Sequence, residues 1–368
     1  MKPNNVSVSG PQFLFVIACF IQASSLLTSF IAPITMQDSW MVVLLASVVF
    51  VPVILLYQSI MQMFPDQNLV QILETVFGKA AGKLVAAVYL WFFLTLSALN
   101  VMDMTSFLSL AVMTETPNIV LTVITVVVAA WAVKAGLSVV VRYGFPFVIA
   151  AFLLIVMSII FLNGHINLQN FLPMLEYRPM RYIQGTHVVL TIPFGELVCV
   201  MMINPALNLT KKEMRRYWLI GFGLGAITLL LIVARDISAL GNVIELFIFP
   251  PLTVLQIINA GTEISRLEIL FATVLIMLSF FKISFLYYVS VSAVTQIFNL
   301  KSAKRIIYSV GAFIVVYGTT LYKGPVNNMA AGIETAPVAW TVVEVLIPIV
   351  IFVTAKLRGF PRTAEETA

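Results

Sequence analysis

Charged residues are scarce in this chain. Lys, Arg, Asp and Glu make up 10% of its 368 residues, whereas apolar residues make up 61%. A soluble domain carries about 25% charged residues, so this composition cannot cover a water-facing surface. The shortage excludes a soluble globular protein. It predicts an all-α polytopic membrane protein, because helices satisfy their own backbone groups in lipid.

Cysteine and histidine are also rare, with two residues of each, and catalytic motifs are lacking. The two cysteines, Cys19 and Cys199, fall inside apolar segments, where a small packing residue is the expected role. The sequence has no Cys-x-x-Cys or Cys/His cluster, no nucleotide-binding loop and no nucleophile elbow. We therefore expect no enzyme, no metal and no cofactor. The basic residues are scattered between apolar runs, so we expect no nucleic acid either.

What the chain does have is long apolar runs. Crossing a bilayer takes about 20 apolar residues, and ten segments qualify. The predicted transmembrane helices are roughly 10–33, 39–63, 84–112, 117–134, 138–163, 185–208, 214–240, 266–298, 304–322 and 338–357. We expect one membrane domain over residues 1–368, with five-helix halves at about 10–163 and 185–357. The tail 361–368 is predicted to be disordered and cytoplasmic.

The distribution of Lys and Arg predicts the orientation. With the N-terminus inside, 15 of the 21 basic residues fall in inner segments and five in outer ones, and Lys282 lies within a span. Cytoplasmic loops carry such an excess. We therefore expect a multi-pass protein with both termini in the cytoplasm.

Two pieces are too short to span. The stretch 67–78 is amphipathic and ends at Gly78, which predicts a helix along the cytoplasmic interface. The stretch from Phe249 to Ala260 contains two prolines and then apolar residues, which predicts a helix over the outer face.

Two ionisable residues near the middle of spans are the best pointers to function, because each costs roughly 2.5–3.5 kcal/mol to insert. Glu196 follows Pro193-Phe194-Gly195, a sequence that predicts an interruption of span six. Lys282 lies halfway along span eight, with Ser279 one turn away. The pair is interpreted as a ligand or proton-coupling site, or as a purely structural ion pair.

Span one contains a third polar feature, Gln22-Ala23-Ser24-Ser25, again near the midplane. These small and hydroxyl residues fit either a loosened backbone or a close helix-packing patch. Spans one and six are the first members of the two halves and run in opposite directions. Such a pattern is typical of an inverted repeat with broken helices that bind a substrate at the midplane. The predicted ligand-binding residues are Gln22, Ala23, Ser24, Ser25, Phe194, Gly195 and Glu196.

Other polar residues lie nearer the outer face. Asn100 and Asp103 share one side of span three and are predicted to line an outer vestibule. Arg235 and Asp236 end span seven and are expected to pair at the interface. Glu344, about six residues into span ten, is expected to reach outward to the interface.

Several short segments, in order, resemble the spore germination B-subunit family, the permease-like subunits of GerA-type germinant receptors. The resemblance covers nearly the whole chain. Its carriers are residues 68–74, 170–176, Pro193-Phe194-Gly195-Glu196, Phe249-Pro250, 263–268 and Lys282-Ile283-Ser284.

This family is distantly similar to amino acid–polyamine–organocation transporters, so the resemblance implies the LeuT-type fold. It also implies a sensor for small nutrients, often amino acids, in the inner membrane of the spore. The implied partners are a larger membrane A subunit and a lipoprotein C subunit. An active, proton-coupled amino acid transporter is the alternative, because it would share the fold and the site.

Overall fold

The computed structural model describes residues 7–162, 164–259 and 267–360. Helices dominate this part of the chain, and its only β pairing is an isolated bridge between Val8 and Leu207. The predicted tail 361–368 and residues 263–266 of one resembling segment lie outside the described residues.

The first half contains eight α-helices and three short helical segments of other kinds. They are α1 Gly10–Gln22, α2 Thr28–Thr35, η1 Met36–Asp38, α3 Ser39–Met63, α4 Leu69–Phe77, α5 Lys79–Phe107, η2 Leu108–Val112, α6 Asn118–Ala135, α7 Leu137–Arg142, α8 Gly144–Phe161 and η3 Leu168–Phe171.

The second half begins with α9 Pro179–Val189. The remaining elements are η4 Leu190–Phe194, η5 Gly195–Ala206, α10 Lys211–Leu240, η6 Gly241–Leu246, α11 Pro250–Asn259, α12 Leu267–Ile297, η7 Ala303–Arg305, α13 Ile307–Leu321, α14 Pro325–Glu334, α15 Ala336–Thr341, η8 Val342–Leu346 and α16 Ile347–Leu357.

Eight helical stretches of the described residues are long and apolar enough to cross a membrane, and α1 and α13 are shorter apolar helices. Their outward side chains are apolar; Val48 is 65% exposed and Trp131 is 74% exposed. Lipid is the solvent that suits such a surface. The multi-pass membrane class is therefore confirmed. The predicted count of ten does not follow from length alone, because the first predicted span is divided between α1 and α2 and the ninth, α13, has 15 residues.

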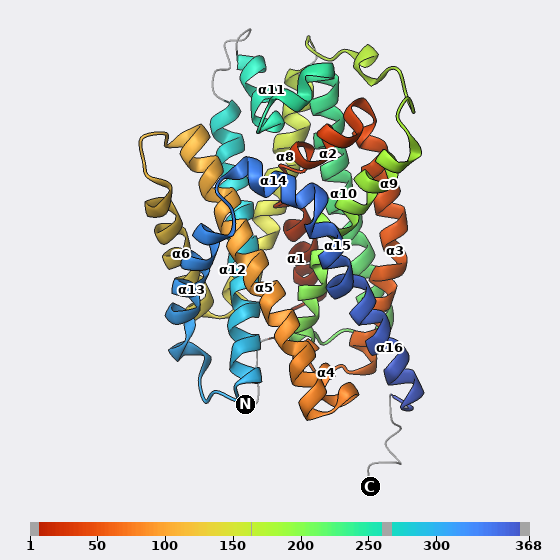
Figure 1. The fold of residues 1–368 in the computed structure, drawn as a ribbon, viewed down its shortest axis with the longest axis vertical. Coiled ribbons are helices and arrows are strands. Elements are labelled where there is room, and N and C mark those ends of the chain that lie inside the picture. The colour runs from red at the N-terminus through yellow and green to blue at the C-terminus, as the bar shows by residue number, and fades with distance from the viewer. Residues whose placement is uncertain (1–6, 163, 260–266, 361–368) are drawn as a thin grey trace.

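Both pieces that were predicted to be too short to span are helical. Asn68 caps α4 by accepting a hydrogen bond from the Gln71 amide, and the helix ends at Gly78 with a φ of 86°. A positive φ of this kind favours glycine, so the predicted end of the helix at Gly78 is confirmed. The helix α11 lies at the end of the bundle opposite α4 (Figure 1).

Both ends of the described chain lie at the α4 end of the bundle. The Val8 amide donates to the Ala206 carbonyl over 2.8 Å, and the Asn204 side chain donates to the Phe64 carbonyl over 2.7 Å. The ring of Phe64 in turn lies 5.2 Å from that of Phe360. Span one thus begins where span six ends, so these two spans run in opposite directions.

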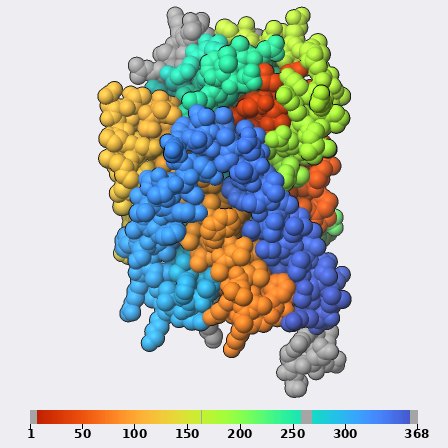
Figure 2. Space-filling model, viewed as in Figure 1, coloured from red at the N-terminus to blue at the C-terminus, as the bar shows by residue number. Residues whose placement is uncertain are grey.

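Close packing of α1 on α10 places span one in the centre of the bundle. A Cβ atom added at Gly221 would lie 2.6 Å from the Leu14 carbonyl oxygen, and one added at Gly225 would lie 2.7 Å from Ile21 Cβ. Small residues let membrane helices approach in this way. The last two spans cover much of the face seen in Figure 2, with α5 visible between them.

Candidate functional site

Span one is interrupted where the polar cluster lies. The helix α1 ends at Gln22, residues 23–27 form turns, and α2 begins at Thr28. The Ser25 hydroxyl donates back to the Gln22 carbonyl, which satisfies one backbone group that the break releases. Within the described chain, the Leu26 amide donates to no backbone carbonyl. The break therefore leaves an amide donor inside the bundle.

Span six is interrupted at Ile192, with φ −119° and ψ 107°, one residue before the proline that predicted the break. The segment before it, η4, is wound as a π-helix, and the segment after it, η5, is wound as a 3-10 helix. Neither winding is usual over such lengths. Proline contributes because it offers no backbone N–H to the helix.

A lysine from α12 joins the two breaks. Lys282 Nζ lies 2.6 Å from Glu196 Oε2, and both side chains are almost completely buried. The same ammonium donates to Ser24 Oγ over 2.9 Å and lies 4.8 Å from the centre of the Phe20 ring. The ion pair neutralises both charges, and the serine and ring supply further favourable contacts.

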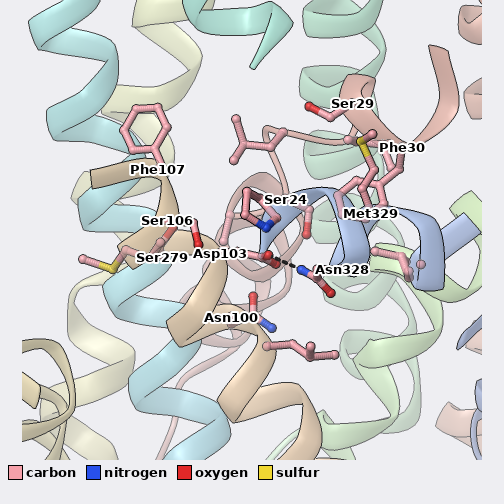
Figure 3. Close-up of a pocket in the computed structure, with 18 of the residues that line it drawn as sticks. Ser24, Ser29, Phe30, Asn100, Asp103, Ser106, Phe107, Ser279, Asn328 and Met329 are labelled. Carbon is pink, nitrogen blue, oxygen red and sulfur yellow. Dashed lines mark hydrogen bonds between the residues drawn. The ribbon is translucent and has the colours of Figure 1, made fainter. Parts of the chain in front are cut away.

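A cavity of about 100 Å³ lies beside this ion pair. It is small against the roughly 300–1,000 Å³ typical of ligand pockets. Its apolar lining includes the Phe107 and Phe249 rings, which lie 5.3 Å apart. Its polar lining is Ser24, Ser29, Asn100, Asp103, Ser106, Glu196, Ser279, Lys282 and Asn328 (Figure 3 labels most of them).

Asp103 stands at the edge of this cavity and points toward Asn328 of α14, whose side-chain amide donates to it (Figure 3). The nearby Asn100 amide is bonded to the Leu96 carbonyl over 2.9 Å. A second cavity, of about 330 Å³, shares Asp103, Ser106 and Asn328 with the first. Asp103 and Asn328 therefore lie where the smaller inner cavity and the larger one adjoin.

The structure brings only some of the sequence-predicted residues to the inner cavity. Ala23, Ser24, Glu196, Ser279, Lys282, Asn100 and Asp103 line it. Gln22 instead donates to Thr228 Oγ1 over 2.8 Å, and the Phe194 ring packs 4.8 Å from that of Phe222. Ser25 lines a different, smaller cavity, and Gly195 packs against Glu344.

The expectation that Glu344 reaches outward is wrong. Its side chain is 0% exposed, and neither carboxyl oxygen has a hydrogen-bond partner among the described residues. A Glu side chain is short, so a position six residues inside a span is too deep for it to reach water. The glycine that precedes Glu196 was the usable signal, because its missing side chain leaves room for this carboxyl.

Arg235 and Asp236 form the expected local pair at 2.6 Å, but it is buried rather than interfacial. Asp236 also accepts from Thr28 Oγ1 over 2.8 Å, and Arg235 donates to Ser158 Oγ over 2.9 Å. This pair ties the start of α2 to α10 and α8. The sequence reasoning passed over Asn328, Ser29 and Ser106, which also line the inner cavity.

A model of the spore germination protein family matches residues 7–323. Spore germination protein KB of Bacillus subtilis is 28% identical over 359 residues, which cover 95% of this chain and 94% of that protein. The putative spore germination protein YfkT of the same bacterium is 23% identical, over 89% of this chain and 91% of its own length.

Solved transporter structures share the fold at low sequence identity. Mhp1, a nucleobase-cation-symport-1 family transporter in a closed conformation, aligns with a TM-score of 0.62 at 13% identity, over 98% of this chain and 87% of its own. A Na⁺-coupled sialic acid symporter aligns with a TM-score of 0.58 at 12% identity, over 92% and 76%. The expected LeuT-type fold is therefore confirmed, and the similarity is to permeases rather than enzymes.

Proposed function

Because the chain belongs to the spore germination protein family, we propose that it is the nutrient-sensing subunit of a germinant receptor. A ligand would bind at mid-membrane between the broken spans one and six. One observation carries this proposal: Lys282 contacts Glu196 beside one break and Ser24 within the other, and all three line the same small cavity. A ligand that shifts one break would therefore also change the contacts of the other through Lys282.

The cavity suits a small zwitterion such as an amino acid. Lys282 and Glu196 neutralise one another, so they leave little net charge to attract an ion. Asp103 has only the Asn328 amide as a hydrogen-bond partner among the described residues, which leaves acceptor capacity for a ligand ammonium. Among the described residues the Leu26 amide, in the break before α2, has no backbone acceptor, and it would receive a carboxylate.

Signalling requires that the ligand bind one conformation better than another. Partners would read that difference, and the family resemblance makes the membrane A subunit and the lipoprotein C subunit the proposed partners. The proposed location is the inner membrane of the spore, with both termini in the cytoplasm. The charge bias of the loops and the shared end of Val8 and Phe360 support that orientation.

The binding proposal is tested with the purified full chain and a panel of radiolabelled L-amino acids in equilibrium dialysis. We expect at least one to bind, and Asp103→Asn to weaken it about tenfold or more, which corresponds to about 1.4 kcal/mol. Asp66→Asn is the matched control, since Asp66 is exposed and distant from the cavity lining. Equal loss in both variants, or no binding across the panel, would contradict the proposal.

The sensing proposal is tested in spores. Deletion of the gene should abolish germination by at least one nutrient, and the wild-type gene should restore it. Normal germination of the deletion strain across a broad nutrient panel would remove the receptor assignment.

An active proton-coupled amino acid transporter is the second candidate. It is favoured by the buried ion pair between Glu196 of the broken span six and Lys282 of α12, and by the transporter fold. Proteoliposomes containing the purified chain decide between the two. Accumulation of an amino acid against its gradient, driven by a pH difference, would establish transport, whereas binding without accumulation favours the sensor.

A further inference from the structure

Glu344 is a buried titratable group that takes no part in the proposed ligand site. It lies in η8 of span ten, its side chain is 0% exposed, and it does not line the inner cavity. Both carboxyl oxygens lack hydrogen-bond partners among the described residues. They pack against Gly195, where an added methyl group would overlap them.

The groups around Glu344 do not compensate a negative charge on it. Tyr57 and Tyr89 donate their hydroxyl hydrogens to the backbone carbonyls of Glu344 and Val343, over 2.6 Å and 2.9 Å, and not to the carboxyl. His187 is bonded to Thr341 over 2.7 Å, one turn before Glu344.

Lys282, the cation whose charge acts on Glu344, is already paired with Glu196. The field of Lys282 favours a charge on Glu344 and that of Glu196 opposes it, and these two form an ion pair at 2.6 Å. An ionised Glu344 would leave the cluster of Glu196, Lys282 and Glu344 with one net negative charge inside the membrane. A neutral carboxyl makes the cluster neutral, and burial strongly favours that state.

We propose that Glu344 is a proton-binding site that keeps the span-six break closed while its carboxyl is neutral. The proton adds to one carboxylate oxygen, and no other group changes. Opening of the break would move Gly195 away and admit water to the carboxyl, which would then release the proton. Proton binding and the conformation of span six are linked in this way, whatever small molecule the inner cavity takes.

Infrared spectroscopy tests the protonation state directly. Wild-type protein with ¹³C-carboxyl glutamate should show, at neutral pH, a protonated carboxylic C=O band that shifts with the label. We expect Glu344→Gln to lose this band and Glu196→Gln to retain it. If the wild type has no label-sensitive protonated band, Glu344 is ionised and the proposal fails, even if the variants do not fold.

The pH dependence of unfolding provides the second test. The folded protein holds one proton on Glu344 that the unfolded chain releases at neutral pH, so stability falls as the pH rises. Between pH 6 and 8, the unfolding equilibrium constant of the wild type should rise by about tenfold per pH unit more than that of Glu344→Gln. Equal slopes would overturn the proposal.

A bound sodium ion is the competing occupant. It would leave the carboxyl ionised, remove the protonated band, and stabilise the wild type in sodium chloride relative to choline chloride. That pattern would also refute the proton site. Both measurements are made without ligand, so their failure is distinct from failure of the receptor assignment.

Discussion

The two broken spans are interrupted in different ways. In span one, five residues, 23–27, leave the helix, and the break lies against the inner cavity and under the Lys282 ammonium. In span six, Ile192 is the residue with non-helical angles, and Phe194 and Gly195 after it are enclosed by aromatic rings and Glu344. Both breaks reach the inner cavity, span six through Ile192 and span one through Ala23, Ser24, Leu26 and Leu27. We call the break of span one the open break, and that of span six the sealed break because packing closes it at Phe194 and Gly195.

This difference indicates that the two breaks have separate roles. The residues of the open break that line the cavity have room to change their partners. The residues after the span-six break are packed against rings and the Glu344 carboxyl, and close-packed interiors resist gradual deformation. Lys282 connects the two, since it contacts Ser24 within one break and Glu196 after the other.

Removing the contacts of Lys282 should produce the largest loss of stability. Lys282→Met leaves Glu196 buried without a counter-charge, and we expect a loss of about 3–5 kcal/mol in the free energy of unfolding. The double variant Lys282→Met with Glu196→Gln should recover most of it. Chemical denaturation of the purified protein in detergent measures both. An equal loss in the double variant would show that the lysine acts through packing rather than charge.

A substitution at the sealed break should produce a smaller loss of stability. Gly195→Ala forces a methyl group against the Glu344 carboxyl in a fully packed region, and we expect a loss of about 1–3 kcal/mol. Gly223→Ala is the matched control, because no atom outside its own helix lies within 4 Å of a Cβ there. The control should be neutral or slightly stabilising. Similar losses in the two variants would contradict the packing of Gly195 on Glu344.

A substitution at the open break should produce the smallest loss of stability. Ser24→Ala removes one donor contact of Lys282 but leaves its pairing with Glu196, so we expect a loss of about 1 kcal/mol. Ser47→Ala is the control, since that hydroxyl donates only to the Val43 carbonyl of its own helix. A loss beyond that of Gly195→Ala would mean that the open break, not the sealed one, limits stability.

Much of the site was predictable because ionisable and helix-breaking residues are rare in apolar spans. Glu196, Lys282 and the cluster 22–25 stood out for that reason. The same reasoning misplaced Glu344, because distance from a span end says nothing about which side of the helix faces protein. It also passed over Asn328, whose position beside Asp103 depends on how α14 folds over the bundle.

Composition and charge alone determined that this chain is a helical membrane protein, because too few charged residues exist to face water and helices are what lipid permits. Pattern alone also placed the span-six break within one residue, and it marked the polar cluster of span one while leaving a break and a packing patch as alternatives. Only the tertiary structure decided that one lysine joins them, that Gln22 and Phe194 face away from the cavity, and that Glu344 is buried against Gly195. These facts arise from contacts between distant spans, and local sequence does not specify which faces meet.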